Sequence, residues 1–64
     1  MPIVHEELQF DKIKHETDKA YIIVCDTNEF VVPKSLVQDL DVEEGLITLP
    51  EWFIEQEGMD EYVL

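Results

Sequence analysis

Carboxylates are the residues of this sequence with the clearest chemical potential, and most of them lie in its second half. From Ser35 onward the chain has nine Asp and Glu residues and no Lys or Arg. One group follows Gln38 and the other follows Pro50; their members are Asp39, Asp41, Glu43 and Glu44, then Glu51, Glu55, Glu57, Asp60 and Glu61. Closely spaced carboxylates attract cations, so three kinds of chemistry come into question: ion pairing with a basic partner, metal binding and acid–base catalysis.

Ion pairing is favoured by the spacing of the first group. On an extended segment, Asp39, Asp41 and Glu43 would share one face, with about 6.6 Å between neighbours at a rise of roughly 3.3 Å per residue. Successive phosphates of a nucleic-acid strand have a similar separation. Glu51 and Glu55 would be neighbours on a helix, where like charges destabilise by roughly 0.2–0.5 kcal/mol, so helix stability does not explain them. A solvated face that only aids solubility is the competing interpretation.

Calcium binding fits the first group poorly. Asp39, Asp41 and Glu43 match positions 1, 3 and 5 of a calcium-binding loop. The sixth position of such a loop requires Gly and the twelfth Glu, whereas this chain has Glu44 and Pro50 there. We therefore expect no calcium site.

Zinc binding and catalysis have even less support. His5 and His15 stand ten residues apart with Cys25 as the one cysteine, which matches no zinc-ligand spacing. Ser35 has no glycine elbow around it and Cys25 has no evident base. A chain this short is also expected to lack a substrate pocket of a few hundred Å³. The sequence predicts a protein that is not an enzyme and has no metal or cofactor.

The overall charge limits the class of partner. Sixteen acidic residues stand against four lysines and no arginine, which gives a formal charge of −12 on 64 residues. Such a surface repels nucleic acid and anionic membranes and attracts basic proteins. Because 45% of the residues are hydrophobic, we expect one folded domain, residues 1–64, rather than disorder. Self-repulsion opposes a compact monomer, so a homodimer sharing apolar surface is a further expectation.

Two features bear on the compartment. The first seven residues have no basic segment followed by an apolar one, as a secretory signal would. No apolar stretch approaches the roughly 20 residues of a membrane span. We expect a cytoplasmic protein, with Cys25 as a buried small hydrophobic residue.

The elements that would position the carboxylates form a small α+β domain. Residues 8–13 alternate weakly as a strand, residues 19–25 and 30–32 predict a β-hairpin, and residues 46–49 predict a further strand. We expect the hairpin turn at residues 26–29 to have Asn28 in a left-handed conformation. Ser35 is expected to cap a short helical turn over Leu36, Val37 and Leu40. The fold class is thus an antiparallel sheet of three to four strands with one short C-terminal helix.

The C-terminal helix should run from Pro50 to Gly58. Pro50 suits the first turn, and Gly58 lies where a left-handed C-cap glycine belongs. We expect Trp52 and Phe53 to anchor the helix in the core. Tyr62, beyond the helix, is the aromatic residue predicted to contact a partner.

Three short motifs carry a resemblance to known proteins: Glu-Thr-Asp-Lys-Ala at residues 16–20, Val-Pro-Lys-Ser at residues 32–35 and Ile-Thr-Leu-Pro-Glu-Trp at residues 47–52. Together they resemble small uncharacterised proteins of phages and mobile elements over residues 16–58. The resemblance implies a phage-encoded origin and no active site. In its small size and acidity, the chain also resembles the acidic anti-CRISPR and anti-restriction inhibitors that phages use against host defence.

Charge and resemblance together lead to two functional hypotheses. The first is a non-enzymatic inhibitor in the bacterial host cell that imitates nucleic acid and binds a basic nucleic-acid-binding protein, such as a CRISPR effector or restriction enzyme. Its binding residues would be the nine carboxylates after Ser35 together with Tyr62. The second is a small accessory or structural module that binds through a sheet edge or through its C-terminal tail, residues 59–64.

Overall fold

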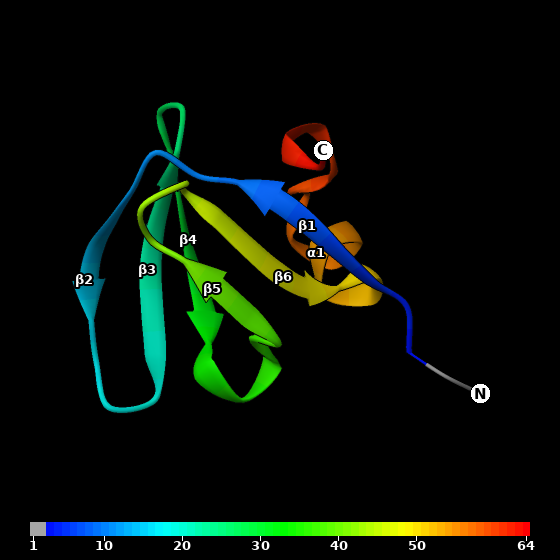
Figure 1. Ribbon diagram of the computed structural model, residues 1–64, viewed down its shortest axis with the longest axis horizontal. Helices are drawn as coiled ribbons and strands as arrows, with labels where there is room; N and C mark the ends of the chain where they lie inside the picture. Colours follow the sequence, from blue (N-terminus) through cyan, green and yellow to red (C-terminus); the bar gives the residue numbers. More distant parts are fainter. Residues whose placement is uncertain (1–2) are drawn as a thin grey trace.

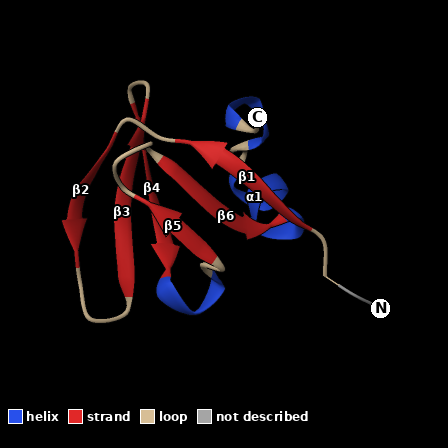
Figure 2. Ribbon diagram, in the orientation of Figure 1, coloured by secondary structure: helices blue, strands red, loops and turns tan. Residues whose placement is uncertain are grey.

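The computed structural model describes residues 3–64 as two three-stranded antiparallel sheets with one short helix. In Figure 1 the strands of the two sheets run in different directions, one set nearly vertical and the other diagonal. The elements in chain order are β1 (His5–Gln9), β2 (Lys12–Glu16), β3 (Ala20–Cys25), β4 (Asn28–Pro33), the 3-10 helix η1 (Lys34–Leu36), β5 (Asp39–Asp41), β6 (Leu46–Pro50), α1 (Glu51–Glu57) and the 3-10 helix η2 (Asp60–Tyr62). Figure 2 shows the predominance of strands.

The expected single sheet is therefore two sheets, ordered β2–β3–β4 and β1–β6–β5. The difference arises at Phe10 and Asp11, inside the segment predicted as one strand. The amide of Phe10 donates to the carbonyl of Gly45 (2.8 Å), whereas the amide of Asp11 donates to the carbonyl of Val24 (2.7 Å). The chain thus crosses from one sheet to the other between these two adjacent residues. The weak alternation of side chains along residues 8–13, which predicted one strand, runs across this crossing.

One core lies between the sheets. The β1–β6–β5 sheet contributes Leu8, Ile47 and Leu49, and the β2–β3–β4 sheet contributes Ile23, Cys25 and Val32, all of them 0–1% exposed. Phe10, Phe53, Ile54 and Met59 complete the buried cluster. The prediction that Cys25 is buried is confirmed, and its thiol donates to the carbonyl of Gln9 (3.7 Å). No buried side-chain polar atom of the described part of the chain lacks a hydrogen-bond partner.

The β3–β4 hairpin is confirmed, but its turn is tighter than predicted. Cys25 pairs with Asn28, which leaves only Asp26 and Thr27 as loop residues. The left-handed residue is Asp26, with φ of 60°, and not Asn28, which belongs to β4. The Asp26 amide donates to a carboxylate oxygen of Asp11 at 2.8 Å, which ties this turn to the sheet crossing.

The helical elements agree with prediction in part. Helix α1 begins after Pro50 and ends at Gly58, whose φ of 73° is the predicted left-handed C-cap. Ser35 lies inside η1 rather than capping it, and Pro33 occupies the N-cap position without a side-chain hydrogen bond.

Trp52 was predicted to lie in the core, and this is wrong: its side chain is 48% exposed, whereas Phe53 is 6% exposed. Residues of an α-helix are rotated by about 100° each, so Trp52 lies about 200° around the axis from the buried Ile54. A seven-residue helix that buries Phe53 and Ile54 therefore leaves Trp52 facing outward.

Candidate functional site

The negative charge of the protein is concentrated in one part of the fold. Residues 12–34, which contain the whole β2–β3–β4 sheet, hold all four lysines and four carboxylates, so their formal charges cancel. The full −12 lies in the remaining residues, which form the β1–β6–β5 sheet, α1 and η2. Both ion pairs within residues 3–64 belong to the neutral part: Lys14 with Glu29 (3.0 Å) and Lys34 with Glu16 (2.6 Å). The carboxylates of the acidic part have no such partner among the described side chains.

The outer face of the β1–β6–β5 sheet carries one row of carboxylates. Asp39 pairs with Thr48 of β6, which in turn pairs with Glu7 of β1, so these three side chains point to the same side. Asp41 lies two residues along β5, on the same side and about 6.6 Å from Asp39. Leu40 points the other way and packs against the core. Glu7 was not predicted as a site residue; its signal was the alternation with Leu8, which is fully buried.

Glu43 does not share this face. The chain leaves β5 at Asp41 and turns over residues 42–45, so the extended segment that was expected to include Glu43 stops short of it. A carboxylate oxygen of Asp41 accepts a hydrogen bond from the Glu44 amide at 3.1 Å, which stabilises the turn. Glu43 and Glu44 are both exposed on it. Gly45 closes the turn with φ of 70°.

The helix holds a separate acidic group. Glu51 and Glu55 lie at positions i and i+4 of α1 and are therefore neighbours, as expected, and Glu57 follows in the last turn. The turn at residues 42–45 and helix α1 are attached to opposite ends of β6, whose five residues span about 13 Å. The predicted site residues thus do not form one patch; they lie at the two ends and along one face of the same sheet.

The C-terminal segment is held by contacts within the fold. Tyr62 accepts a hydrogen bond from the Asn28 amide group (2.8 Å), and its ring meets that of Phe30 edge-on at 6.0 Å. Val63 forms a bridge with Leu8, and the amide of Leu64 donates to the carbonyl of Glu7 at 3.0 Å. Asp60 and Glu61 remain exposed on η2. Tyr62 therefore has a structural role in joining η2 to the hairpin.

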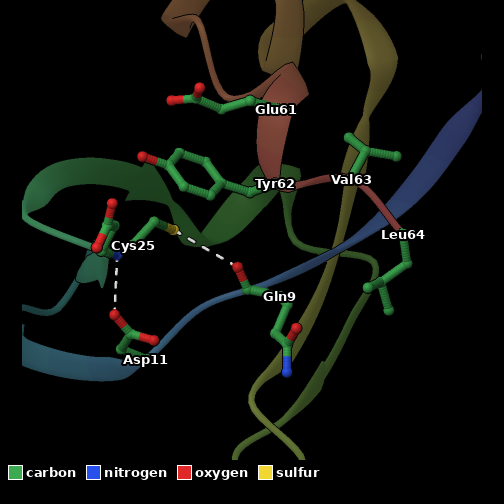
Figure 3. Close-up of a pocket in the computed structure, with 8 residues that line it drawn as sticks. Gln9, Asp11, Cys25, Glu61, Tyr62, Val63 and Leu64 are labelled. Carbon is green, nitrogen blue, oxygen red and sulfur yellow. Dashed lines mark hydrogen bonds between the residues drawn. The ribbon is translucent and has the colours of Figure 1, made fainter.

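A cavity of about 340 Å³ lies between this segment and the β3–β4 turn, contrary to the expectation that so short a chain lacks one (Figure 3). Its walls include the carboxylates of Asp11, Asp26 and Glu61. Asp11 and Asp26 were not predicted as site residues, because they stand outside the acidic half of the chain. Only the sheet crossing, which joins the two by a hydrogen bond, places them beside η2.

Cys25 also reaches this cavity, but its chemistry there is weak. Burial, with a smaller contribution from the negative charge of Asp11, raises the pKa of the thiol to about 11. The thiolate is the nucleophilic form of cysteine, so Cys25 stays protonated and unreactive at neutral pH.

Among residues 3–64, no group of three or more His, Cys, Asp or Glu side chains is arranged to hold a metal ion. No helix in the same stretch is long and apolar enough to cross a membrane. What the arrangement offers chemically is a set of largely exposed carboxylates, without ion-pair partners among the described residues, on the β1–β6–β5 sheet, its turn, α1 and η2.

No family model matches the chain, and no curated protein or solved structure is significantly similar to it.

Proposed function

We propose that the protein is a non-enzymatic inhibitor that binds a basic, nucleic-acid-binding protein through the carboxylates of its acidic part. The observation that carries the proposal is the partition of charge, with residues 12–34 neutral and the entire −12 on the rest of the fold. Unpaired carboxylates create a negative potential that attracts the Lys and Arg side chains of a nucleic-acid-binding groove. Charges neutralised within the protein would contribute little to such a field.

The spacing of the carboxylates on the outer sheet face supports imitation of a nucleic-acid backbone. Asp39 and Asp41 follow each other at about 6.6 Å along β5, and Glu7 lies two strands away from Asp39, about 10 Å across the sheet. The separation along β5 is comparable to that between successive phosphates of one strand. Because these side chains project from paired strands, the protein loses little backbone freedom on binding.

The target class follows from charge and from the resemblance described above. A CRISPR effector or a restriction enzyme of a bacterial host has the long basic groove that such a surface would occupy. Occupation of that groove would block nucleic acid without any catalytic step. The second hypothesis, binding through a sheet edge or through the C-terminal tail, stands as the alternative. Val63 bridges Leu8 and the Leu64 amide donates to Glu7, but the Leu64 side chain is 70% exposed.

The proposal is tested by neutralising the carboxylates of β5 and its turn. In the variant D39N/D41N/E43Q/E44Q, affinity for an identified basic partner should fall at least tenfold, chiefly through a slower on-rate. Competing DNA or RNA should displace the wild-type protein, and added salt should weaken both ligands. The double variant D18N/D26N is the matched control, because it removes two exposed charges of the neutral part.

Unaltered affinity of the quadruple variant, together with no competition from nucleic acid, would rule out charge imitation by this face. Because the control removes two charges and the quadruple variant four, a loss of binding free energy in the control that is half as large would point instead to net charge alone.

A further inference from the structure

Trp52 is an exposed aromatic side chain in the first turn of α1. It is 48% exposed, although the adjacent Phe53 is buried and holds the indole edge-on at 5.9 Å with the two rings at 89°. An indole fixed by packing on one side and open to solvent on the other loses little entropy when a partner covers it. Trp residues in such settings dominate the binding energy of many interfaces.

The backbone that precedes β1 lies beside the start of α1. His5 pairs with Pro50, and the carbonyl of Val4 accepts a hydrogen bond from the amide of Glu51 at 2.8 Å. This pairing holds the segment before β1 next to the helix, as Figure 1 shows. Ile3 and Val4 are 61% and 58% exposed. We call Ile3, Val4 and Trp52 the Trp52 patch.

Carboxylates frame this patch on the helix. Glu51 directly precedes Trp52, and Glu55 lies at i+3, which is one turn along the same side. Neither carboxylate takes part in an ion pair among residues 3–64. An aromatic face with unpaired carboxylates around it is a combination that binds cations, by attraction to the ring and by ion pairing.

The charge also decides against the simplest alternative occupant, a second copy of this chain. Two copies related by a two-fold axis through α1 would bring Glu51 and Glu55 of one close to the same residues of the other. Each copy carries a formal charge of −12, so the whole approach is repulsive. A basic partner experiences the opposite field.

We propose that the Trp52 patch receives an arginine side chain of the basic partner, with its guanidinium stacked on the indole and paired with Glu55 or Glu51. This inference rests on the proposed function and names the anchoring contact within it. Arginine fits better than lysine because its planar guanidinium stacks on aromatic faces, binds carboxylates with two donors and is more weakly hydrated. Ile3 and Val4 would cover the aliphatic part of the arginine side chain.

The experiment uses acetylated, amidated hexa-arginine and hexa-lysine peptides as probes of equal charge. Trp52 is the only tryptophan, so its fluorescence reports on this site alone. In the free protein the emission should be that of a solvated indole, open to quenching by acrylamide. Hexa-arginine should shift the emission and protect it from acrylamide. It should also bind more tightly than hexa-lysine, and this preference should be about 2- to 5-fold larger in the wild-type protein than in the variant Trp52→Leu. A difference of that size corresponds to one exposed cation–π contact.

Calorimetric titration of Trp52→Leu supplies the decisive comparison, since leucine keeps an apolar side chain and removes the ring. The extra preference for arginine should disappear in Trp52→Leu and return in part in Trp52→Phe. Val31→Ala, which shortens another exposed apolar side chain (57% exposed) in the neutral part, should keep it.

The possible results separate this inference from the function on which it rests. If both peptides bind with salt-sensitive affinity but Trp52→Leu keeps the full arginine preference, the anchor is wrong while the acidic binding surface stands. If neither peptide binds, both proposals fail. Protection of Trp52 by protein alone at rising concentration would show a second copy on the patch and would also overturn the inference.

Discussion

The two sheets of this protein enclose one core, but their outer surfaces differ in charge. The outward side chains of β3 and β4 include Ile22, Val24 and Val31, of which Val31 is largely exposed. The corresponding side of the β1–β6–β5 sheet carries Glu7, Asp39 and Asp41. Charge on the first sheet is balanced by local lysines, whereas charge on the second is balanced by nothing in the described fold.

The unpaired acidity belongs to one part of the fold, the β1–β6–β5 sheet with its turn, α1 and η2. Charge that served solubility alone would work wherever it was placed and would most help to cover the apolar side of the β2–β3–β4 sheet. That side instead carries Ile22, Val24 and Val31 together with Glu29, whose charge is balanced by Lys14. An uneven distribution of this kind is what a directed electrostatic interaction requires.

The largest test concerns the shared core. Phe53→Ala should lower the free energy of unfolding by about 3–5 kcal/mol, because it truncates a buried aromatic residue. Trp52→Ala, one position away on the exposed side, should cost only about 1 kcal/mol. Urea unfolding followed by circular dichroism measures both. If the β2–β3–β4 sheet stays folded in Phe53→Ala while the other sheet melts, the two sheets are independent units and do not share one core.

An intermediate effect is expected at the turn that joins the acidic strands. Gly45 and Gly58 have almost equal positive φ, but a Cβ on Gly45 would lie 2.6 Å from the carbonyl oxygen of Phe10, whereas a Cβ on Gly58 meets nothing within 4 Å. Gly58→Ala should therefore cost about 1–2 kcal/mol for the left-handed backbone alone. Gly45→Ala should cost clearly more, because the turn must also move away from the sheet crossing. Equal losses of thermal stability would show that the turn yields freely.

The smallest expected effect separates the two kinds of surface charge. Neutralising Asp39, Asp41, Glu43 and Glu44 should raise the melting temperature at low salt, because it removes mutual repulsion, by the equivalent of about 1 kcal/mol or less. At about half-molar salt the gain should vanish through screening. Replacing the Lys14–Glu29 pair by Met and Gln should have the opposite sign at low salt, since it removes an attraction. Identical salt responses of the two variants would contradict the division of the fold into a charge-balanced part and an acidic part.

Local patterns predicted the elements well. Three predictions rested on neighbours in sequence, and all three were confirmed. They are the β-branched strand β3, the start of α1 after Pro50 and its end at Gly58, and the burial of Cys25 and Phe53. Trp52 was misplaced because hydrophobicity alone does not tell which side of a two-turn helix meets the core.

Such local patterns did not predict which distant segments of the chain pair with each other. The division into two sheets depends on which carbonyls the amides of Phe10 and Asp11 meet, and both partners are far away in sequence. The same holds for the candidate site. The acids on β5 were found from their spacing, but Glu43 left the face because of a turn, and Glu7 joined it through pairing with β6.

The strand order also sets the sequence of events by which the protein can fold. The β2–β3–β4 sheet is complete within residues 12–33, so its pairings close short loops only. Strand β1 is the earliest strand of the chain, yet its partners on the two sides are β6 and Val63. Contacts of such long sequence separation form slowly. We therefore expect amides of β3 to gain protection from hydrogen exchange before those of β1 during refolding, and simultaneous protection in pulse-labelling would contradict this order.

Until β1 pairs, the inner side of the β2–β3–β4 sheet, with Ile23 and Val32, stays uncovered. The newly made chain is therefore most prone to aggregation at the stage when its acidic sheet has not yet formed.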